Sequence, residues 1–176
     1  MIKISKGLDL PISGTPSLTI ADEPKCSSVS LLGNDFVGMK PTMMVKVGEK
    51  VKAGQKIFED KKNPGIFYTS PAGGEVKSIN RGDKRRFLSI EIEISDNEDF
   101  EYFDISQEHG PNEIRQCLIS SGTWNVFRTR PFNRTPSIDS SPKALFINCC
   151  DTNPLSVDPY NVINQDKDLF DEGLKI

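Results

Sequence analysis

Short apolar segments separated by turns fill the first part of the chain. Between residues 88 and 94 apolar and polar positions alternate strictly, which predicts a strand with one buried and one solvent-facing side. The turn signal Asn63-Pro64-Gly65 lies between the apolar segments 56–58 and 66–68, which predicts a hairpin. Glycine and proline punctuate this region at intervals of roughly ten residues, a spacing typical of small all-β units. The pattern therefore predicts a β-domain over residues 1–100.

A weak internal repeat lies within this β-domain. The segment 47–50 recurs as 81–84, and each copy places glycine, an acidic residue and lysine between apolar strands. Two such turns predict two similar β-halves that pack on each other.

Helical patterns begin after residue 100. Pro111 suits the first turn of a helix, apolar residues then recur on one face, and Gly122 suits the end of the helix. Residues 123–142 contain several prolines and arginines and predict a long connection. Residues 101–142 are therefore expected to form one helix and its connection.

A third region covers residues 143–176. Residues 143–147 predict a buried strand, and Asp158-Pro159 predicts the start of a helix that ends at Gly173. Residues 174–176 have the character of a further strand that is just beginning. A β-α-β unit with so short a second strand is unfinished, so we expect the chain to be a fragment of a longer protein.

The composition narrows the class of protein. Hydrophobic residues make up 36% and charged residues 27% of the chain, which excludes collagen, coiled-coil and fully disordered classes. The longest apolar runs are too short for a membrane-spanning helix. The first residues lack the apolar stretch of a signal peptide, which favours a cytoplasmic chain.

The cysteines and the histidine indicate no metal site. The 4 cysteines form no C-x-x-C pair, and the single histidine, His109, has no cysteine at ligand spacing. In a cytoplasmic chain we expect these cysteines to be reduced and mostly buried thiols.

Positive charge is concentrated between residues 40 and 86, which hold 12 basic and 5 acidic side chains in a chain of net charge -3. Such a surplus indicates either a surface that faces a partner or phospholipid, or simply the solvated face of a β-domain. Its densest part, residues 83–86, has no interleaved aromatic residues on which bases could stack, so no nucleic-acid partner is expected.

Residues 45–57 and 70–76 resemble the flattened β-sandwich, or barrel-sandwich hybrid, of biotinyl and lipoyl carrier domains. Carriers present a modified lysine at a hairpin tip, and Lys61 and Lys62 lie near the corresponding place. The resemblance allows a lipoyl or biotinyl carrier modified at Lys61 or Lys62. The alternative is a pair of solvated charges leading into the turn. The short spacing from Gln55 and the Pro-Gly that follows favour this alternative.

Two further segments carry candidate chemistry. In the loop around residues 119–132, Arg128, Arg130 and Phe132 are candidate contacts for an anion, a quinone or a partner protein. The alternative is that the aromatic residues close a core and the arginines bond nearby carbonyls. Residues 148–155 follow the predicted strand, where α/β sheets place ligands, but ordinary turn chemistry explains them equally well.

Six segments spread over the whole chain resemble the A subunit of the bacterial Na+-translocating NADH:quinone reductase. These segments are residues 6–14, 36–43, 58–65, 79–85, 127–132 and 151–155. Members of that family are considerably longer, so the chain would be the N-terminal part. The resemblance implies an α+β fold: the biotinyl/lipoyl-like β-sandwich over 1–100, the helix and connection over 101–142, and the truncated start of a Rossmann-like α/β domain over 143–176.

The resemblance also implies a function. It implies a peripheral subunit on the cytoplasmic face of the bacterial inner membrane, within a six-subunit complex that passes electrons from NADH through flavins and iron-sulfur centres to ubiquinone and exports Na+. Its partners would be the other subunits, with ubiquinone a further ligand, and it would meet the membrane only through those subunits.

The family resembles the flavin-binding subunit of respiratory complex I and the C subunit of the Rnf complex, but two of their motifs are altered here. Residues 122–127 have one glycine and two bulky aromatic residues in place of a glycine-rich flavin loop, and Asn153 replaces a glutamate. No cysteine cluster for an iron-sulfur centre is present in the sequence. We therefore expect no bound cofactor and no catalytic residue in this part of the protein.

Overall fold

The computed structural model describes residues 3, 7, 11–20, 26–96, 99–103, 110–151 and 153–175. These residues fall into two compact units. One unit spans Lys25–Ser141, and the other combines Met1–Pro24 with Pro142–Ile176. The three-part division at residues 100 and 142 stays a prediction.

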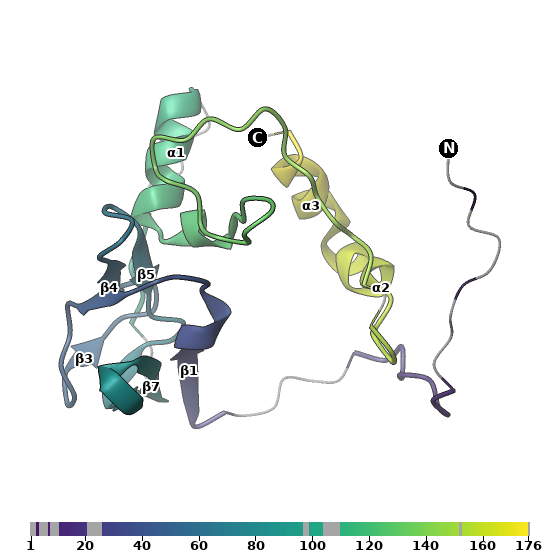
Figure 1. The fold of residues 1–176 in the computed structure, drawn as a ribbon. Helices are drawn as coiled ribbons and strands as arrows, with labels where there is room; N and C mark the ends of the chain where they lie inside the picture. Colours follow the sequence, from purple (N-terminus) through teal and green to yellow (C-terminus); the bar gives the residue numbers. More distant parts are fainter. Residues whose placement is uncertain are drawn as a thin grey trace. The chain divides into compact units, whose positions relative to one another are not determined.

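The unit Lys25–Ser141 is built on two antiparallel sheets (Figure 1). The strands in chain order are β1 (Ser28–Leu32), β2 (Pro41–Met43), β3 (Lys50–Val51), β4 (Lys56–Asp60), β5 (Phe67–Thr69), β6 (Gly74–Arg81) and β7 (Phe87–Ile94). One sheet has the order β1-β7-β6-β3 and the other β2-β4-β5. The predicted strand at residues 88–94 and the predicted hairpin, now β4 and β5, are both confirmed.

Both sheets contribute to one apolar core. Ile57, Phe58, Tyr68, Ile90 and Ile92 are almost completely buried, and Tyr68 stacks on Phe58 with ring centroids 4.7 Å apart. Each side chain of this size stabilises the fold by roughly 1.5–3 kcal/mol when it leaves water. The alternation of β7 is thus explained from Ile90 onward, since Ile90 and Ile92 are buried in the core while Glu93 is exposed; Leu88, at the start of the predicted pattern, is 40% exposed instead.

The prediction drawn from the internal repeat is wrong. The first copy leads into β3 and the second connects β6 to β7, so both belong to the four-stranded sheet. Their turns also differ, because Gly48 has a φ of +83° whereas Gly82 has a φ of -96°. In the second copy the short 3-10 helix η2 (Asp83–Arg85) makes the turn, and Lys84 and Arg85 adopt the left-handed conformation.

The predicted helix is α1 (Pro111–Ser120), and its predicted start and stop are confirmed: Pro111 lies in its first turn and Gly122 follows it with a φ of +78°. The 3-10 helix η3 (Thr123–Val126) then inserts Trp124 into the core of the sandwich. The indole Nε1 of Trp124 donates a hydrogen bond to the Pro136 carbonyl at 3.1 Å. The predicted connection, residues 123–142, therefore packs on the β-sandwich through Trp124.

The second unit contains α2 (Pro159–Ile163), the 3-10 helix η4 (Asn164–Asp166) and α3 (Lys167–Gly173). The predicted helix start is confirmed, since the Asp158 side chain accepts a hydrogen bond from the Tyr160 amide at 3.0 Å. The single helix predicted up to Gly173 is interrupted at Asp166, whose ψ of 43° is not helical.

The predicted buried strand at residues 143–147 is wrong. Among the described residues of this segment no strand forms, and the side chain of Phe146 is 94% exposed. A strand needs a neighbour for its backbone hydrogen bonds and a cover for its apolar faces, and no described residue of this unit offers either. Residues 174 and 175 form a turn rather than a strand, and residue 176 lies outside the described residues.

Candidate functional site

A basic pocket of about 470 Å³ opens on the sandwich unit. It lies between the 3-10 helix η1 (Gly33–Asp35), the segment that leads to β2, the tip of the β4–β5 hairpin and the turn between β6 and β7. Pairing of β1 with β7 brings η1 beside the β6–β7 turn. The fold thus joins four segments that are far apart in the sequence.

Six exposed cationic side chains line this basic pocket, and no acidic residue does. They are Lys40, Lys62, Arg81, Lys84, Arg85 and Arg86. The salt bridges within the described residues are Lys52–Asp99 and Lys77–Glu91, so none of the six is paired with a described carboxylate. Like charges held this close raise the local positive potential and favour a bound anion.

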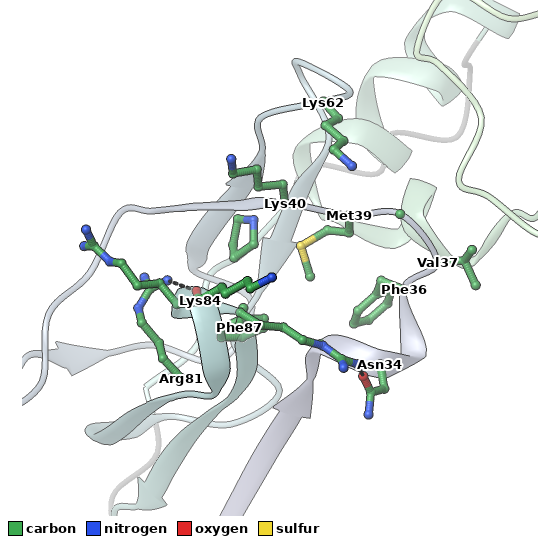
Figure 2. A pocket seen from close by; sticks show the side chains of 14 residues that line it. Asn34, Phe36, Val37, Met39, Lys40, Lys62, Arg81, Lys84 and Phe87 are labelled. Carbon is green, nitrogen blue, oxygen red and sulfur yellow. Dashed lines mark hydrogen bonds between the residues drawn. The ribbon is translucent and has the colours of Figure 1, made fainter.

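The lower part of the basic pocket is apolar. Phe87 is buried, Phe36 and Met39 are half-buried, and Val37 is exposed at the rim. Figure 2 shows Phe36, Met39 and Phe87 at the centre, with Arg81, Lys84, Lys40 and Lys62 around them. The site therefore combines an apolar floor with a cationic wall, the arrangement by which small-molecule sites hold an organic body and orient a charged group.

Hydrogen bonds hold the wall in place. The guanidinium of Arg86 donates to Asn34 Oδ1, and Arg81 Nη1 donates to the Arg85 carbonyl at 3.4 Å. On the opposite side, Asp60 Oδ1 accepts the amide hydrogens of Lys40 at 3.0 Å and of Lys62 at 2.9 Å. These hydrogen bonds tie the cation-bearing segments to Asn34, to Asp60 and to one another.

Lys61 and Lys62 lie at the tip of the hairpin, and both side chains are exposed. The backbone around them is tied down: Lys61 donates its amide hydrogen to the Lys40 carbonyl at 2.8 Å, and Asn63 Nδ2 donates to the carbonyls of Thr135 and Pro136. Lys62 also belongs to the basic pocket. The hairpin tip is therefore held against the sandwich unit and lines the basic pocket, and it does not project freely from the unit.

Arg128 lies inside the sandwich unit, where its guanidinium donates to the carbonyls of Asn125 and Phe127. Its guanidinium carbon is also 5.7 Å from the ring centroid of Phe36, so Arg128 contacts a residue of the pocket without lining the pocket itself. Arg130 and Phe132 are exposed, Phe132 by 71%. The structure therefore places Arg128 beside one lining residue of the pocket, Phe36, and leaves Arg130 and Phe132 on the surface.

No metal centre forms among the residues that the structure describes. The expectation of mostly buried thiols is wrong, because Cys26, Cys149 and Cys150 are exposed and only Cys117 is half-buried. These three cysteines lie in irregular segments rather than on packed faces. His109 lies outside the described residues.

The segment 148–155 shows turn chemistry. Asp151 Oδ1 accepts hydrogen bonds from the amide and the side chain of Asn153, at 2.9 and 2.8 Å, and the described side chains here are mostly exposed. Thr152 is not among the described residues. These contacts satisfy the polar groups locally and build no ligand pocket.

Two family models cover almost the whole chain. Residues 2–95 match the NqrA N-terminal barrel-sandwich hybrid domain, and residues 110–176 match the NqrA second alpha/beta domain. The chain belongs to the NqrA family. The resemblance noted in the sequence and the predicted α+β fold class are both confirmed.

Several NqrA proteins are similar over the full chain. Each is named as the A subunit of a Na(+)-translocating NADH-quinone reductase. The identity is 49% for the protein from Photorhabdus laumondii, 48% for that from Vibrio alginolyticus and 46% for that from Neisseria gonorrhoeae. The alignments cover 100% of this chain and 40% of each relative. The chain therefore spans less than half the length of these NqrA proteins.

The sequence predicted part of this NqrA site. The basic surplus between residues 40 and 86 contains all six cations, but Asn34, Phe36 and Phe87 were not predicted to be near them. Asn34 and Phe36 come close to the cations because β1 pairs with β7. A pattern within one segment of the sequence does not reveal which distant strand that segment pairs with. No helix among the described residues has the length and apolar character needed to span a membrane.

Proposed function

We propose that the chain forms the N-terminal part of a peripheral subunit of a Na+-pumping NADH:ubiquinone oxidoreductase. The observation that carries this proposal is the 45–49% identity over the whole chain to proteins named as the A subunit of a Na(+)-translocating NADH-quinone reductase. The enzyme as a whole transfers electrons from NADH to ubiquinone and couples this transfer to Na+ export. This part of the protein has a structural role on the quinone side and contributes no catalytic residue.

We further propose that residues 1–176 bind none of the complex's cofactors. The backbone around Gly122 supports this proposal, because three of its amide groups already donate to backbone carbonyls: Gly122 to Ile119, Asn125 to Gly122 and Phe127 to Trp124. A flavin phosphate needs such amides free and approachable. The flavins, iron-sulfur centres and NADH site therefore belong to other parts of the complex.

The proposed partners are the other subunits of a six-subunit complex, with ubiquinone as a further ligand. The protein lies on the cytoplasmic face of the bacterial inner membrane and is anchored there through its partners. Arg130 and Phe132 are candidate contacts because both are exposed on the sandwich unit, whereas Arg128 is half-buried and its guanidinium donates to the Phe127 carbonyl.

Purification of the tagged full-length protein tests its membership of the complex. We expect it to co-purify from detergent-solubilised membranes with NADH:quinone reductase activity that Na+ stimulates. A photocrosslinker in place of Arg130 should capture another protein of the complex, whereas one in place of the exposed Glu75 serves as a control on the same unit. Purification without any associated reductase activity would refute the proposal.

The alternative function is a lipoyl or biotinyl carrier modified at Lys61 or Lys62. It follows from the shared barrel-sandwich hybrid fold. The hydrogen bonds of Asn63 to the carbonyls of Thr135 and Pro136 argue against a carrier, because they hold the hairpin tip against the sandwich unit. The intact mass of the native protein distinguishes the two: a mass increase of lipoate or biotin on either lysine establishes the carrier, and an unmodified mass excludes it.

A further inference from the structure

We propose that the basic pocket binds a small polyanion that carries phosphate groups. This inference goes beyond the proposed function, since it concerns a ligand site on the sandwich unit and does not depend on assembly of the complex. The phosphate belongs to a free polyphosphate compound or to a lipid headgroup, and the chemistry of recognition is the same for both.

The number and kind of cations favour a polyanion. Six cationic side chains surround a volume of about 470 Å³ with no carboxylate among the lining residues. A single carboxylate would balance only one of these charges. Arg81, Arg85 and Arg86 supply planar guanidinium groups that bind phosphate oxygens in pairs, and Lys40, Lys62 and Lys84 add point charges.

The turn between β6 and β7 is shaped for this role. Lys84 and Arg85 both adopt left-handed backbone angles, with φ of 53° and 62°. Such a conformation costs a residue other than glycine on the order of 1–2 kcal/mol. The turn keeps this conformation at two successive cationic residues, and both of them line the basic pocket. Figure 2 shows the Lys84 side chain beside Phe87.

The apolar floor sets the size of the ligand. Phe36 and Met39 are only half-buried, and Val37 is 47% exposed at the rim, so the pocket offers apolar contact below its cationic wall. Inorganic phosphate alone would leave this floor uncovered. The ligand therefore has an organic body as well as its phosphates.

Calorimetric titration of the full-length protein with pyrophosphate and with ATP, at physiological ionic strength, tests the site. We expect both to bind, ATP more tightly because its organic body covers the floor. The double variant Arg81→Ala/Lys84→Ala should weaken binding at least tenfold. The matched control Lys46→Ala/Lys50→Ala removes the same charge from exposed positions outside the basic pocket and should change affinity less than twofold.

Vesicle flotation distinguishes the two sources of phosphate. Binding to cardiolipin vesicles, whose headgroup carries two phosphates, but not to phosphatidylcholine vesicles, lost in the pocket variant alone, identifies a lipid headgroup. Binding of ATP without flotation identifies a free compound. The proposal is overturned if neither probe binds, if both double variants weaken binding equally, or if a hexaglutamate peptide competes as well as ATP, which would indicate an acidic protein segment instead. Each outcome is independent of co-purification with the reductase.

Discussion

The carboxylate of Asp60 accepts a hydrogen bond from the backbone amide of Lys40 at 3.0 Å, across 20 residues of sequence. The same oxygen accepts the amide of Lys62, and the Asp60 side chain is only 6% exposed. One buried carboxylate thus fixes two backbone segments that each place a lysine in the basic pocket. Asp60 is a positioning residue for that pocket.

Replacing Asp60 tests this role. Asp60→Ala leaves two partly buried amides without an acceptor and should lower the free energy of unfolding by about 3 kcal/mol, whereas Asp60→Asn keeps an acceptor oxygen and should cost about 1 kcal/mol. Urea unfolding followed by the fluorescence of Trp124, the only tryptophan, measures both. An Asp60→Ala variant as stable as the wild type would contradict the assignment.

Gly122 and Gly48 form a matched pair of positions. Both have positive φ, but a Cβ on Gly122 would lie 2.7 Å from the Thr69 side chain, while one on Gly48 would meet nothing within 4 Å. Gly48→Ala should therefore cost only the conformational penalty of about 1–2 kcal/mol. Gly122→Ala should cost clearly more in the same urea experiment. Equal costs would show that the contact with Thr69 relaxes freely.

The ion pair between Lys77 and Glu91, 3.1 Å apart, makes a small contribution that depends on pH. The hydrogen bond from Lys77 holds the pKa of Glu91 below its ordinary value of 4.5. A lowered pKa in the folded state means that the stabilisation is present above pH 4.5 and is lost as the pH falls through the folded pKa.

Glu91→Gln should accordingly unfold at a slightly lower urea concentration than the wild type at neutral pH, and the two should converge in acid. On the alkaline side, Glu91 raises the pKa of Lys77, so the contribution fades as the pH rises above the ordinary lysine value of 10.5. If the difference in stability between Glu91→Gln and the wild type did not change with pH, the effect would come from packing and not from the ion pair.

The hydroxyl of Tyr68 is buried and has no hydrogen-bond partner of good geometry among the described residues. Burial raises the pKa of Tyr68, although Thr135 and Arg128 lie close enough to oppose the increase. Tyr68→Phe should therefore change the free energy of unfolding by no more than about 1 kcal/mol, because no good hydrogen bond is lost. Tyr68→Ala should cost about 3–5 kcal/mol by comparison. A large loss in Tyr68→Phe would reveal a hydrogen bond made by this hydroxyl.

The parts of the fold that depend on local chemistry were predictable. The alternation of residues 88–94, the Asn63-Pro64-Gly65 turn, and the helix starts at Pro111 and Asp158 each follow from short-range rules. The predicted strand at 143–147 failed because a strand also needs partners, which an apolar run does not specify. Local patterns therefore predict elements better than they predict what the elements pack against.

The candidate site shows the same limit. The sequence revealed the basic surplus but left open whether Trp124 belongs to a contact surface or to the core. That question is decided by the Pro136 carbonyl and by the apolar residues of the sandwich core, both of which depend on tertiary structure. Likewise, Phe36 joins the cations only because β1 pairs with β7.

Packing of the α1 region on the sandwich has a consequence for the smallest piece of this protein that can fold autonomously. Trp124 lies in the core, and Leu118, Phe127 and Ile138 pack against it, although all four follow the last strand in sequence. A polypeptide that ends near residue 100, where the β-pattern stops, would lack these four side chains. It would expose apolar core surface and would therefore tend to aggregate. We therefore expect residues 25–141, rather than the β-strands alone, to be the shortest piece that folds stably.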